Sequence, residues 1–534
     1  MYLYCRNVRF FLALTILVLL GSHQCWSQQK SKVILRGANS MKNLKVNGQD
    51  IIRYIGNVKF EYEKTVITCD SAYSNPSENW FNAYRNVVVS QENSKLYGDV
   101  LNFDGKTSLG KLTGREVRLV DEEATLVTDI MYFNSKTGFA YYNSGGNITT
   151  KDSRLKSQRG YYDRNKSNLA FAGNVEMHNA DGKIFTDSLR YDTKIKLASF
   201  FGPTFIYNKE NFVYCEKGWY NRSLEQSSFQ TNAYLINGAQ KLFGDNIFYD
   251  KANGYARLLG QVVVVDTANN TYVYGDKANY WDAKKEAEVT DNPYVMMLEG
   301  SDTLFLRSDK LFLKTIKDST INTPDSTYRL IKAIGNVKFY RSDVQGVCDS
   351  MIFNTLDSTL TMHIEPVLWN DVNQMSANHI KMYSSDKKIK QIDFDGAAFV
   401  ASFEEKDRFS QMQGKKIFAR FTNGKLAKLD VVGNGQTVYY TRENDTITMV
   451  NRAECSSITI LVKNNKPSRI SYREKVSSNF YPVDKIDKEE VTLKGFRWLD
   501  GLRPLNKYSI VPKTLTLFPV EKGKNHKFKD LSLN

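Results

Sequence analysis

One short pattern recurs along most of the chain, and its acidic residue is the feature of this sequence most able to do chemistry. The pattern is an apolar residue, any residue, a small residue, an acidic or amide residue, and an aromatic residue four positions later, as in Leu242–Tyr249 (LFGDNIFY). A column of stacked carboxylates could bind Ca²⁺ or act as an acid pair. The polar position is held in turn by Asp70, Asp99, Asp129, Gln158, Asp187, Glu216, Asp245, Asp276, Asp309, Asp349, Asn378, Lys415 and Glu454.

Two properties of this column favour a structural role over a chemical one. Gln158 and Lys415 interrupt the carboxylates, and the glycine-rich signature of Ca²⁺-binding β-helices is missing. The position just before the column is small in every copy, for example Cys69, Gly244 and Ala453. A small residue suits a bend or bulge in a strand, and the neighbouring carboxylate can accept hydrogen bonds from backbone N–H groups that the bend frees. We therefore predict that the acidic residue caps a bend.

The sequence indicates no other catalytic or metal-binding chemistry. Beyond the amino-terminal leader there are four histidines, His178, His363, His379 and His526, and none has the spacing of a metal ligand. It contains no nucleophile elbow, Cys/His pair or phosphate-binding loop. The sequence therefore predicts no catalytic residue, no metal and no cofactor.

The segments that contain the acidic column are predicted to be β-strands. Tyr, Phe, Val, Ile and Thr dominate the patterned segments. A second signal, Gly-Asn-Val or a variant, alternates with the first, and Ile55–Phe60 and Ile334–Phe339 share the letters IGNVKF. We interpret Gly-Asn as a turn that leads into a strand. A repeat of roughly 29 residues then holds two strands and two turns, and about thirteen repeats predict an all-β array whose units pack on their neighbours.

Composition changes along the chain predict five segments. Residues 1–27 resemble a cleavable signal peptide, with Arg6 and Arg9 before an apolar run, Phe10–Leu20, that is too short to span a bilayer. An uncleaved anchor and a lipoprotein are the alternatives. The remaining predicted segments are a first array (28–313), a polar insertion or linker (314–331), a second, more divergent array (332–480) and an irregular basic tail (481–534).

The net charge limits the classes of binding partner, and the spacing of the cysteines argues against disulfide bonds. The formal net charge is +15, but export argues against nucleic acid, which leaves membrane head groups, phosphorylated lipids and acidic polysaccharides. If each repeat adds one layer of about 4.8 Å, Cys69 and Cys215, five copies apart, lie about 24 Å from each other. A disulfide needs Cα atoms within about 7 Å. We therefore expect Cys69, Cys215, Cys348 and Cys455 to be small, buried and unpaired.

The alternation of the two signals resembles the OstA/LptA family of periplasmic lipopolysaccharide-transport proteins. The resemblance is clearest in the segments Ile55–Tyr73, Leu169–Tyr191 and Leu242–Tyr280. It extends over Val33–Leu313 and, more weakly, over Leu330–Tyr472. It implies an elongated open β-jellyroll (a β-taco), a folded sheet whose interior shields acyl chains. It also implies a periplasmic location, either free or in association with the outer membrane. The implied partners are lipopolysaccharide or a related lipid and like proteins added end to end, strand to strand.

The resulting hypothesis is a non-enzymatic periplasmic carrier or bridge for lipopolysaccharide. A structural or adhesive envelope protein is the alternative, followed by a parallel β-helix enzyme acting on acidic polysaccharide. Lys59, Lys338 and Arg341 are candidate contacts for lipid phosphates, although ordinary solvated strand residues would look the same. The candidate groove-lining residues are the pattern aromatics Phe103, Phe133, Tyr162, Tyr191, Tyr249, Tyr280 and Phe353.

Overall fold

The computed structural model describes twelve stretches of the chain. They are residues 32–91, 93–122, 124–163, 166–180, 182–208, 211–317, 327–385, 388–423, 425–444, 446–463, 466–513 and 519–522. The predicted signal peptide, the centre of the polar insertion and the last twelve residues lie outside them. The chain divides into two compact units, Met1–Ala140 and Tyr141–Asn534, and each is described here by itself.

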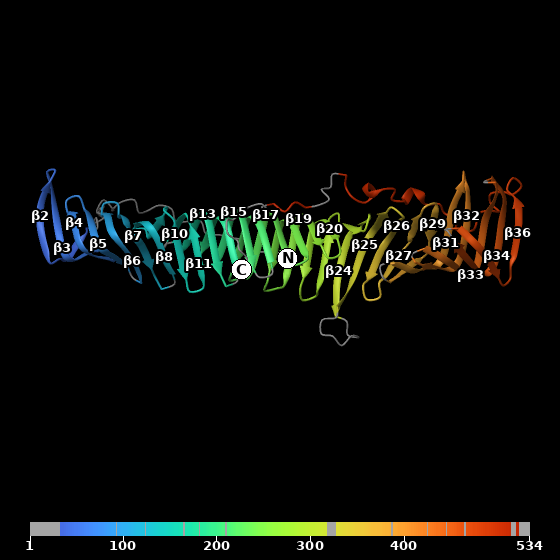
Figure 1. Cartoon of the computed structure of the whole chain (residues 1–534), viewed down its shortest axis with the longest axis horizontal. Coiled ribbons are helices and arrows are strands. Elements are labelled where there is room, and N and C mark those ends of the chain that lie inside the picture. Colours follow the sequence, from blue (N-terminus) through green and yellow to red (C-terminus); the bar gives the residue numbers. More distant parts are fainter. Residues whose placement is uncertain are drawn as a thin grey trace, which may run out of the picture. The chain divides into compact units, whose positions relative to one another are not determined.

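The described residues form antiparallel β-strands, so the predicted all-β class is confirmed. The first unit holds β1 (Ile34–Gly37), β2 (Ser40–Val46), β3 (Gln49–Tyr62), β4 (Thr65–Asn75), β5 (Trp80–Gln91), β6 (Ser94–Asp104), β7 (Leu109–Val120) and β8 (Ala124–Asn134). β9 (Phe139–Tyr142) lies at the division of the units. Within each unit the strands follow one another in chain order as a folded sheet of the jellyroll kind, and Figure 1 shows their succession.

The second unit continues the same pattern. Its strands are β10 (Gly146–Thr150), β11 (Ser153–Ser157), β12 (Arg159–Asp163), β13 (Asn168–Asn179), β14 (Gly182–Asp192), β15 (Leu197–Asn208), β16 (Asn211–Asn221), β17 (Gln226–Asn237), β18 (Gln240–Asp250), β19 (Tyr255–Asp266), β20 (Thr271–Trp281), β21 (Glu286–Thr290), β22 (Tyr294–Glu299), β23 (Asp302–Arg307), β24 (Lys310–Lys317), β25 (Thr327–Arg341), β26 (Val344–Asn354), β27 (Thr359–His363), β28 (Val367–Asn370), β29 (Asn373–Ser376), β30 (His379–Ser385), β31 (Lys388–Glu405), β32 (Arg408–Thr422), β33 (Lys425–Glu443), β34 (Thr446–Lys463), β35 (Lys466–Arg473) and β36 (Ser477–Pro482). Two 3₁₀ turns follow, η1 (Asp500–Leu502) and η2 (Lys507–Ser509).

The Gly-Asn signal marks a bulge inside a strand, and its interpretation as a turn before a strand is wrong. Gly173-Asn174 lies in the middle of β13, and the β13–β14 register shifts between Ala172 and Val175. Both residues have positive φ, 79° and 48°. Two successive left-handed residues displace the strand without ending it, and glycine and asparagine tolerate that conformation best. The turns between strands lie instead at polar segments such as the one between β18 and β19.

The bulges divide the sheet of the second unit into two halves that share one apolar interior. We call the half that contains Gln240–Gly244 of β18 leaf A, and the half that contains Asn246–Asp250 leaf B. Ile247 of leaf B belongs to a long buried cluster, and Leu242 of leaf A packs against the same cluster. Phe243, between Leu242 and the bulge, belongs to a separate cluster on the outer face of leaf A. The two leaves therefore face each other across the interior.

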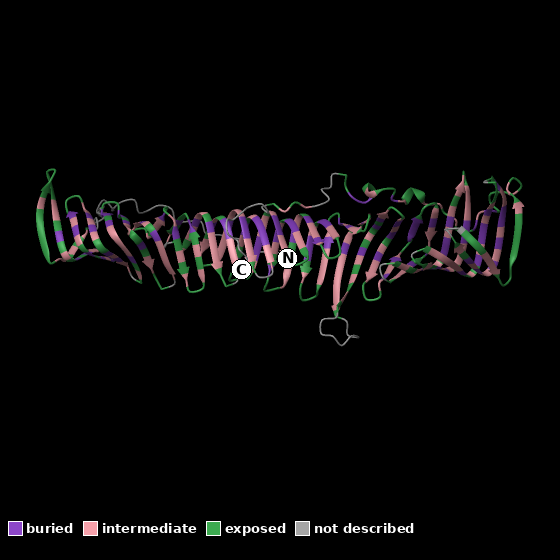
Figure 2. Ribbon diagram, in the orientation of Figure 1, coloured by how far each residue is buried: buried purple, intermediate pink, exposed green. Residues whose placement is uncertain are grey.

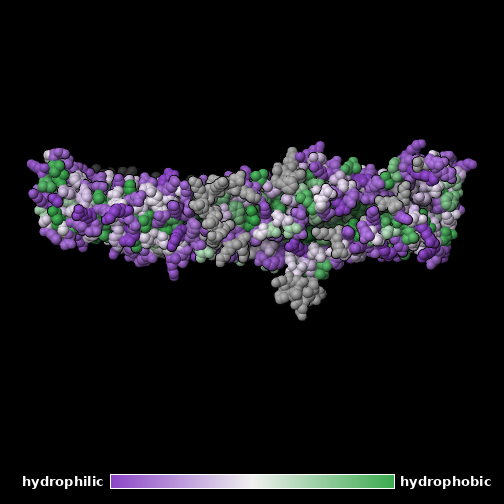
Figure 3. Space-filling view, viewed as in Figure 1, coloured by the Kyte–Doolittle hydropathy of each residue, from purple (hydrophilic) through white to green (hydrophobic). Residues whose placement is uncertain are grey.

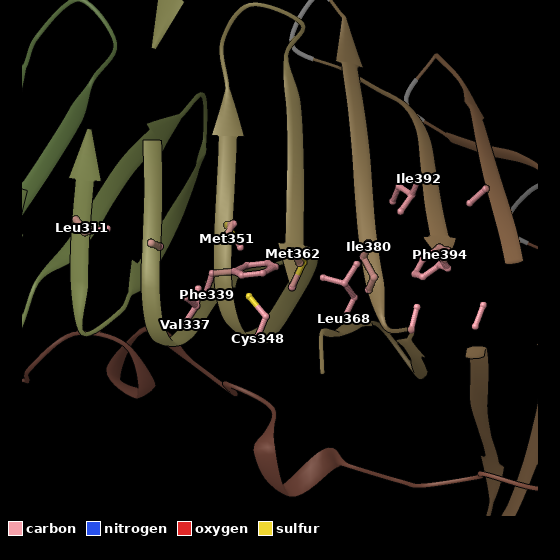
Figure 4. Packing of buried hydrophobic residues seen from close by; sticks show 14 of the residues in the cluster. Leu311, Val337, Phe339, Cys348, Met351, Met362, Leu368, Ile380, Ile392 and Phe394 are labelled. Carbon is pink, nitrogen blue, oxygen red and sulfur yellow. The ribbon is translucent and has the colours of Figure 1, made fainter. Parts of the chain in front are cut away.

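Successive strands contribute side by side to this interior. Figure 4 shows the part from Leu311 to Phe394, where side chains such as Phe339, Met351 and Leu368 come from successive strands. Buried segments alternate with exposed ones along each strand (Figure 2), as strands with one covered face require. Hydrophilic side chains predominate on the face seen in Figure 3, which agrees with apolar side chains being turned inward.

The polar segment and the C-terminal segment depart from the regular array. Lys317 of β24 pairs with Thr327 of β25, so the residues between them connect two neighbouring strands. After β36 the chain leaves the sheet and returns along the second unit (red in Figure 1). Among the described residues, no helix is long and apolar enough to cross a membrane.

Candidate functional site

The acidic column lies on the outer side of the bends, against the Gly-Asn bulges. Asn86 Nδ2 donates to Asp70 Oδ2 at 2.9 Å, and Asn336 Nδ2 donates to Asp309 Oδ2 at 2.7 Å. The backbone N–H of Arg115 donates to Asp99 Oδ2 at 2.9 Å. The predicted capping of a backbone N–H is confirmed at Asp99. Asp70 and Asp309 instead hold the bulge through the side chain of its asparagine.

The same contact explains the glycine of the bulge. A Cβ atom built on Gly260 would lie 2.3 Å from Asp245 Oδ2 and 3.0 Å from Asp245 Cβ, and one built on Gly335 would lie 2.5 Å from Asp309 Oδ2. Both glycines also have positive φ, 70° and 77°. The two signals of the repeat are therefore the two contacting parts of one bend. Sequence reasoning recognised each signal but not their contact.

The small position beside the column faces the crowded interior. A Cβ on Gly275 would lie 2.5 Å from Val289 Cγ1, and one on Gly98 would lie 2.7 Å from Leu112 Cγ. The four described cysteines are buried and unpaired, as predicted. Burial raises the pKa of the Cys215 thiol to about 12, so this side chain is a neutral filler at neutral pH.

In the first unit, aromatic rings fill the interior from both sides of the bulges. Phe60, which follows the bulge of β3, stacks on Phe81, which precedes the bulge of β5, with ring centroids 4.8 Å apart, and Phe81 lies 5.3 Å from Phe103. Tyr62 lies 5.0 Å from Phe103, and its hydroxyl lies 2.9 Å from Ser108 Oγ. Phe81 is 0% exposed and Phe103 3%. The interior of this unit is therefore closed by its own side chains.

In the second unit, the corresponding interior row carries exposed tyrosines. Tyr249 lies two residues from buried Ile247 on β18, so both side chains project from the inner face of leaf B. Tyr220, Tyr249 and Tyr280 alternate with Ser227 and Ala256 in one cross-strand row. Their exposures are 41%, 42% and 37%. Apolar ring surface is thus accessible on the inner face of leaf B.

The seven candidate groove-lining residues fall into three groups. Phe103 is buried; Phe133, Tyr191 and Phe353 are half-buried; Tyr162, Tyr249 and Tyr280 are exposed. Tyr280 Oη donates to Asp282 Oδ1 at 3.0 Å, and burial of the ring, followed by Asp282, raises the pKa of Tyr280. Tyr220 belongs to the same row. It lies four positions after Glu216, as the pattern requires, but it was not among the residues predicted to line the groove.

The three candidate cations do not form one cluster. Lys59 and Lys338 are exposed, and each precedes a buried phenylalanine on its strand, so both lie on outer faces. Arg341 is bound to two carboxylates, with Nη1 3.0 Å from Glu299 Oε2 and Nε 2.6 Å from Asp343 Oδ1.

The structure pairs two histidines that no spacing rule indicated. His363 of β27 and His379 of β30 are cross-strand partners, and their Nδ1 atoms lie 3.3 Å apart. Burial, and secondly the charge of His379, lowers the pKa of His363. Only the strand register, which crosses the β28–β29 hairpin, brings them together. Among the described residues, no group of three or more His, Cys, Asp or Glu side chains could hold a metal ion.

Comparison with known proteins supports the resemblance drawn from the sequence. Residues 30–184 and 170–245 match the family model described as OstA-like protein. One solved structure with similarity is LptH, the LptA homologous periplasmic component of the conserved lipopolysaccharide transport device from Pseudomonas aeruginosa. It is 11% identical to this chain, covers 26% of this chain and 95% of its own, and has a TM-score of 0.21. Curated proteins give no match.

The fold and the interior define the class of protein: a folded antiparallel β-array with an apolar interior between two leaves. Within that class, residues 30–245 match the OstA-like family, and the predicted resemblance to the OstA/LptA family is confirmed over this part of the chain.

Proposed function

We propose that this chain is a non-enzymatic periplasmic carrier or bridge for lipopolysaccharide on its way to the outer membrane. The OstA-like match, together with the resemblance to a family of periplasmic lipopolysaccharide-transport proteins, supports this cargo and this location. The accessible row of Tyr220, Tyr249 and Tyr280 on the inner face of leaf B is the observation that supports a carrier role. Burial of each acyl CH₂ group contributes about 0.8 kcal/mol, so a continuous apolar face can hold acyl chains without a charged binding residue.

In this proposal, only the second unit contacts the lipid. Stacked rings occupy the interior of the first unit, whereas the second unit presents ring faces with phenol groups. Tyrosine suits the boundary between an acyl chain and a polar head group, because its ring is apolar and its hydroxyl is polar. We therefore place cargo contact in the second unit, from Tyr162 to Tyr280.

Site-specific photo-crosslinking tests this proposal. A photoreactive amino acid at Tyr249 should capture lipopolysaccharide in cells, and the same residue at Phe248 should not. Phe248 is the matched control: it is the preceding residue on β18 and lies on the opposite face, 6.3 Å from Trp219 and 5.7 Å from the guanidinium of Arg257. Equal capture at both positions, or none at Tyr220, Tyr249 and Tyr280, would instead favour the structural envelope role.

A further inference from the structure

The C-terminal segment follows one continuous row of the sheet in the second unit. The row lies on the outer face of leaf A, and each member is the cross-strand partner of the next. We call this row the tail track: Lys241, Val265, Tyr272, Met296, Phe305, Tyr340, Gln345, Trp369, Gln374, Ala401, Gln411, Val438 and Arg452.

Two buried glutamines of the track clamp the backbone of the segment. Gln411 Nε2 donates to Val491 O at 3.0 Å, and the N–H of Leu493 donates to Gln411 Oε1 at 2.9 Å. Gln374 repeats this reciprocal pair with Arg497 O at 2.7 Å and the N–H of Leu499 at 2.6 Å. The two side chains are 5% and 2% exposed. Each of these amides donates to the carbonyl of one residue of the segment and accepts from the N–H two residues later, so it recognises the backbone rather than a side chain.

A third glutamine holds a side chain of the segment. Gln345, 4% exposed, accepts from Arg503 Nε at 2.9 Å and from Arg503 Nη2 at 2.7 Å. Arg503 Nη1 also donates to Asp371 O at 3.0 Å. In Figure 4 the C-terminal ribbon passes the strands that carry these groups. This contact adds a requirement for arginine to the backbone recognition.

Two apolar pairs fix the register of the segment on the track. Val491 and Leu493, 7% and 2% exposed, join a buried cluster with Ala401 and Val438. Ile510 and Val511, 1% and 3% exposed, join a second cluster: Tyr274, Tyr294, Met296 and Phe305. Fully burying side chains of this size contributes about 1.5–3 kcal/mol each, so these pairs supply affinity and the glutamines supply alignment.

One buried hydrogen-bond donor of the tail track, the indole N–H of Trp369, is not used by the segment. Trp369 lies between Gln345 and Gln374 in the row, is 0% exposed, and its indole Nε1 has no hydrogen-bond partner among the described residues. A buried unpaired donor is costly. It gives the track one recognition element beyond those that the segment uses.

We propose that the tail track is a polypeptide-recognition surface whose occupant is the chain's own segment 488–511, bound as a tethered ligand. Units of a repeat array otherwise contact only their neighbours. The bound segment links strands from β20 to β34, so it straps distant repeats together. The tether keeps the effective concentration of the segment high, and the buried apolar pairs should hold the segment on the track after cleavage as well.

A cleavable full-length chain tests the proposal. A protease site inserted between the exposed residues Asp484 and Lys485 leaves every contact described above intact. After cleavage, the fragment that begins at Lys485 should co-elute with the array, and an excess of a synthetic peptide of sequence 488–513 should displace it. Departure of the fragment at micromolar concentration with an unchanged circular dichroism spectrum would overturn the proposal. So would a retained fragment that no peptide displaces, because the segment would then be part of the fold, and so would a fragment bound to a second copy.

Substitutions separate recognition from general stability. Gln374→Leu and Gln411→Leu should each weaken retention about tenfold, since each leaves a backbone N–H of the segment buried without its acceptor. The matched control is Gln413→Leu: Gln413 lies two residues further on the same face of β32 and donates to Gln436 Oε1 at 2.5 Å. Equal loss in all three variants would refute the assignment of Gln374 and Gln411 as the clamps. Circular dichroism of the uncleaved variants shows whether each has folded.

Discussion

Replacing Gly260 by alanine tests whether the acidic column and the Gly-Asn bulge form one bend. Two costs add at this position. The residue has φ of 70°, a left-handed conformation that costs an L-residue with a side chain about 1–2 kcal/mol. The new Cβ would also lie 2.3 Å from Asp245 Oδ2 and 3.0 Å from Asp245 Cβ, so the exposed Asp245 side chain has to leave its rotamer, at a cost of about 0.5–1.5 kcal/mol. We therefore expect a loss of about 1.5–3.5 kcal/mol of local stability at β18 and β19.

Gly300→Ala is the matched control for this substitution. Gly300 has φ of 63°, but a Cβ there meets nothing within 4 Å. It should therefore incur the backbone cost alone, about 1–2 kcal/mol. The difference between the two variants measures the contact with Asp245.

Native-state hydrogen exchange is the appropriate assay, because a long array need not unfold in one step. Amides of β18 and β19 should exchange faster in Gly260→Ala, and an added Asp245→Gly substitution should restore part of the protection. Equal effects of Gly260→Ala and Gly300→Ala, or no rescue by Asp245→Gly, would refute the reasoning that the carboxylate selects glycine at the bulge.

Three further predictions concern one interior ring and two titratable side chains. Phe81→Ala should lower the stability of the first unit by about 3–5 kcal/mol by chemical denaturation, because the ring is 0% exposed and stacks on Phe60 at 4.8 Å, whereas Tyr249→Ala, at a 42% exposed ring, should change stability little. The Cys215 thiol, whose pKa burial raises to about 12, should react with a thiol reagent at pH 8 only after denaturation, and rapid native labelling would contradict its burial. The pKa of His363 should lie below about 6.5 in an NMR titration, because burial and then His379 disfavour its charged form, and His379→Asn should raise it. The unfolded chain then binds more protons below pH 6.5, so the contribution of His363 to stability is present above that pH and is lost as the pH falls through the pKa of the folded protein.

Sequence reasoning recovered the local rules of the fold. The strand composition, the small position and its acidic neighbour follow from pleat geometry, and the structure keeps all three. The Gly-Asn signal was misread because glycine and asparagine mark positive φ, and positive φ serves both turns and bulges. Only the pairing of β13 with β14 on both sides of Gly173-Asn174 shows which of the two occurs.

The sequence predicted which face of the strand the candidate groove residues occupy, but it did not predict how exposed they are. Period two places Ile247 and Tyr249 on one face, and the structure keeps them there. Exposure along the row could not be read from the pattern, since Phe103 and Tyr249 hold the same position in their repeats but are 3% and 42% exposed. Their difference depends on what the facing leaf supplies, as Tyr62 does for Phe103.

The sequence by itself determined the repeat, and with it the strand class, the bends and the alternation of inner and outer side chains, because these depend on residues a few positions apart. Tertiary structure alone decided which contacts join residues that are far apart in the chain: Asp245 against Gly260, His363 beside His379, and Gln411 around the backbone of Leu493. The C-terminal segment illustrates the limit best. It has no strand period of its own, and its conformation is set by a row of side chains contributed by many separate strands.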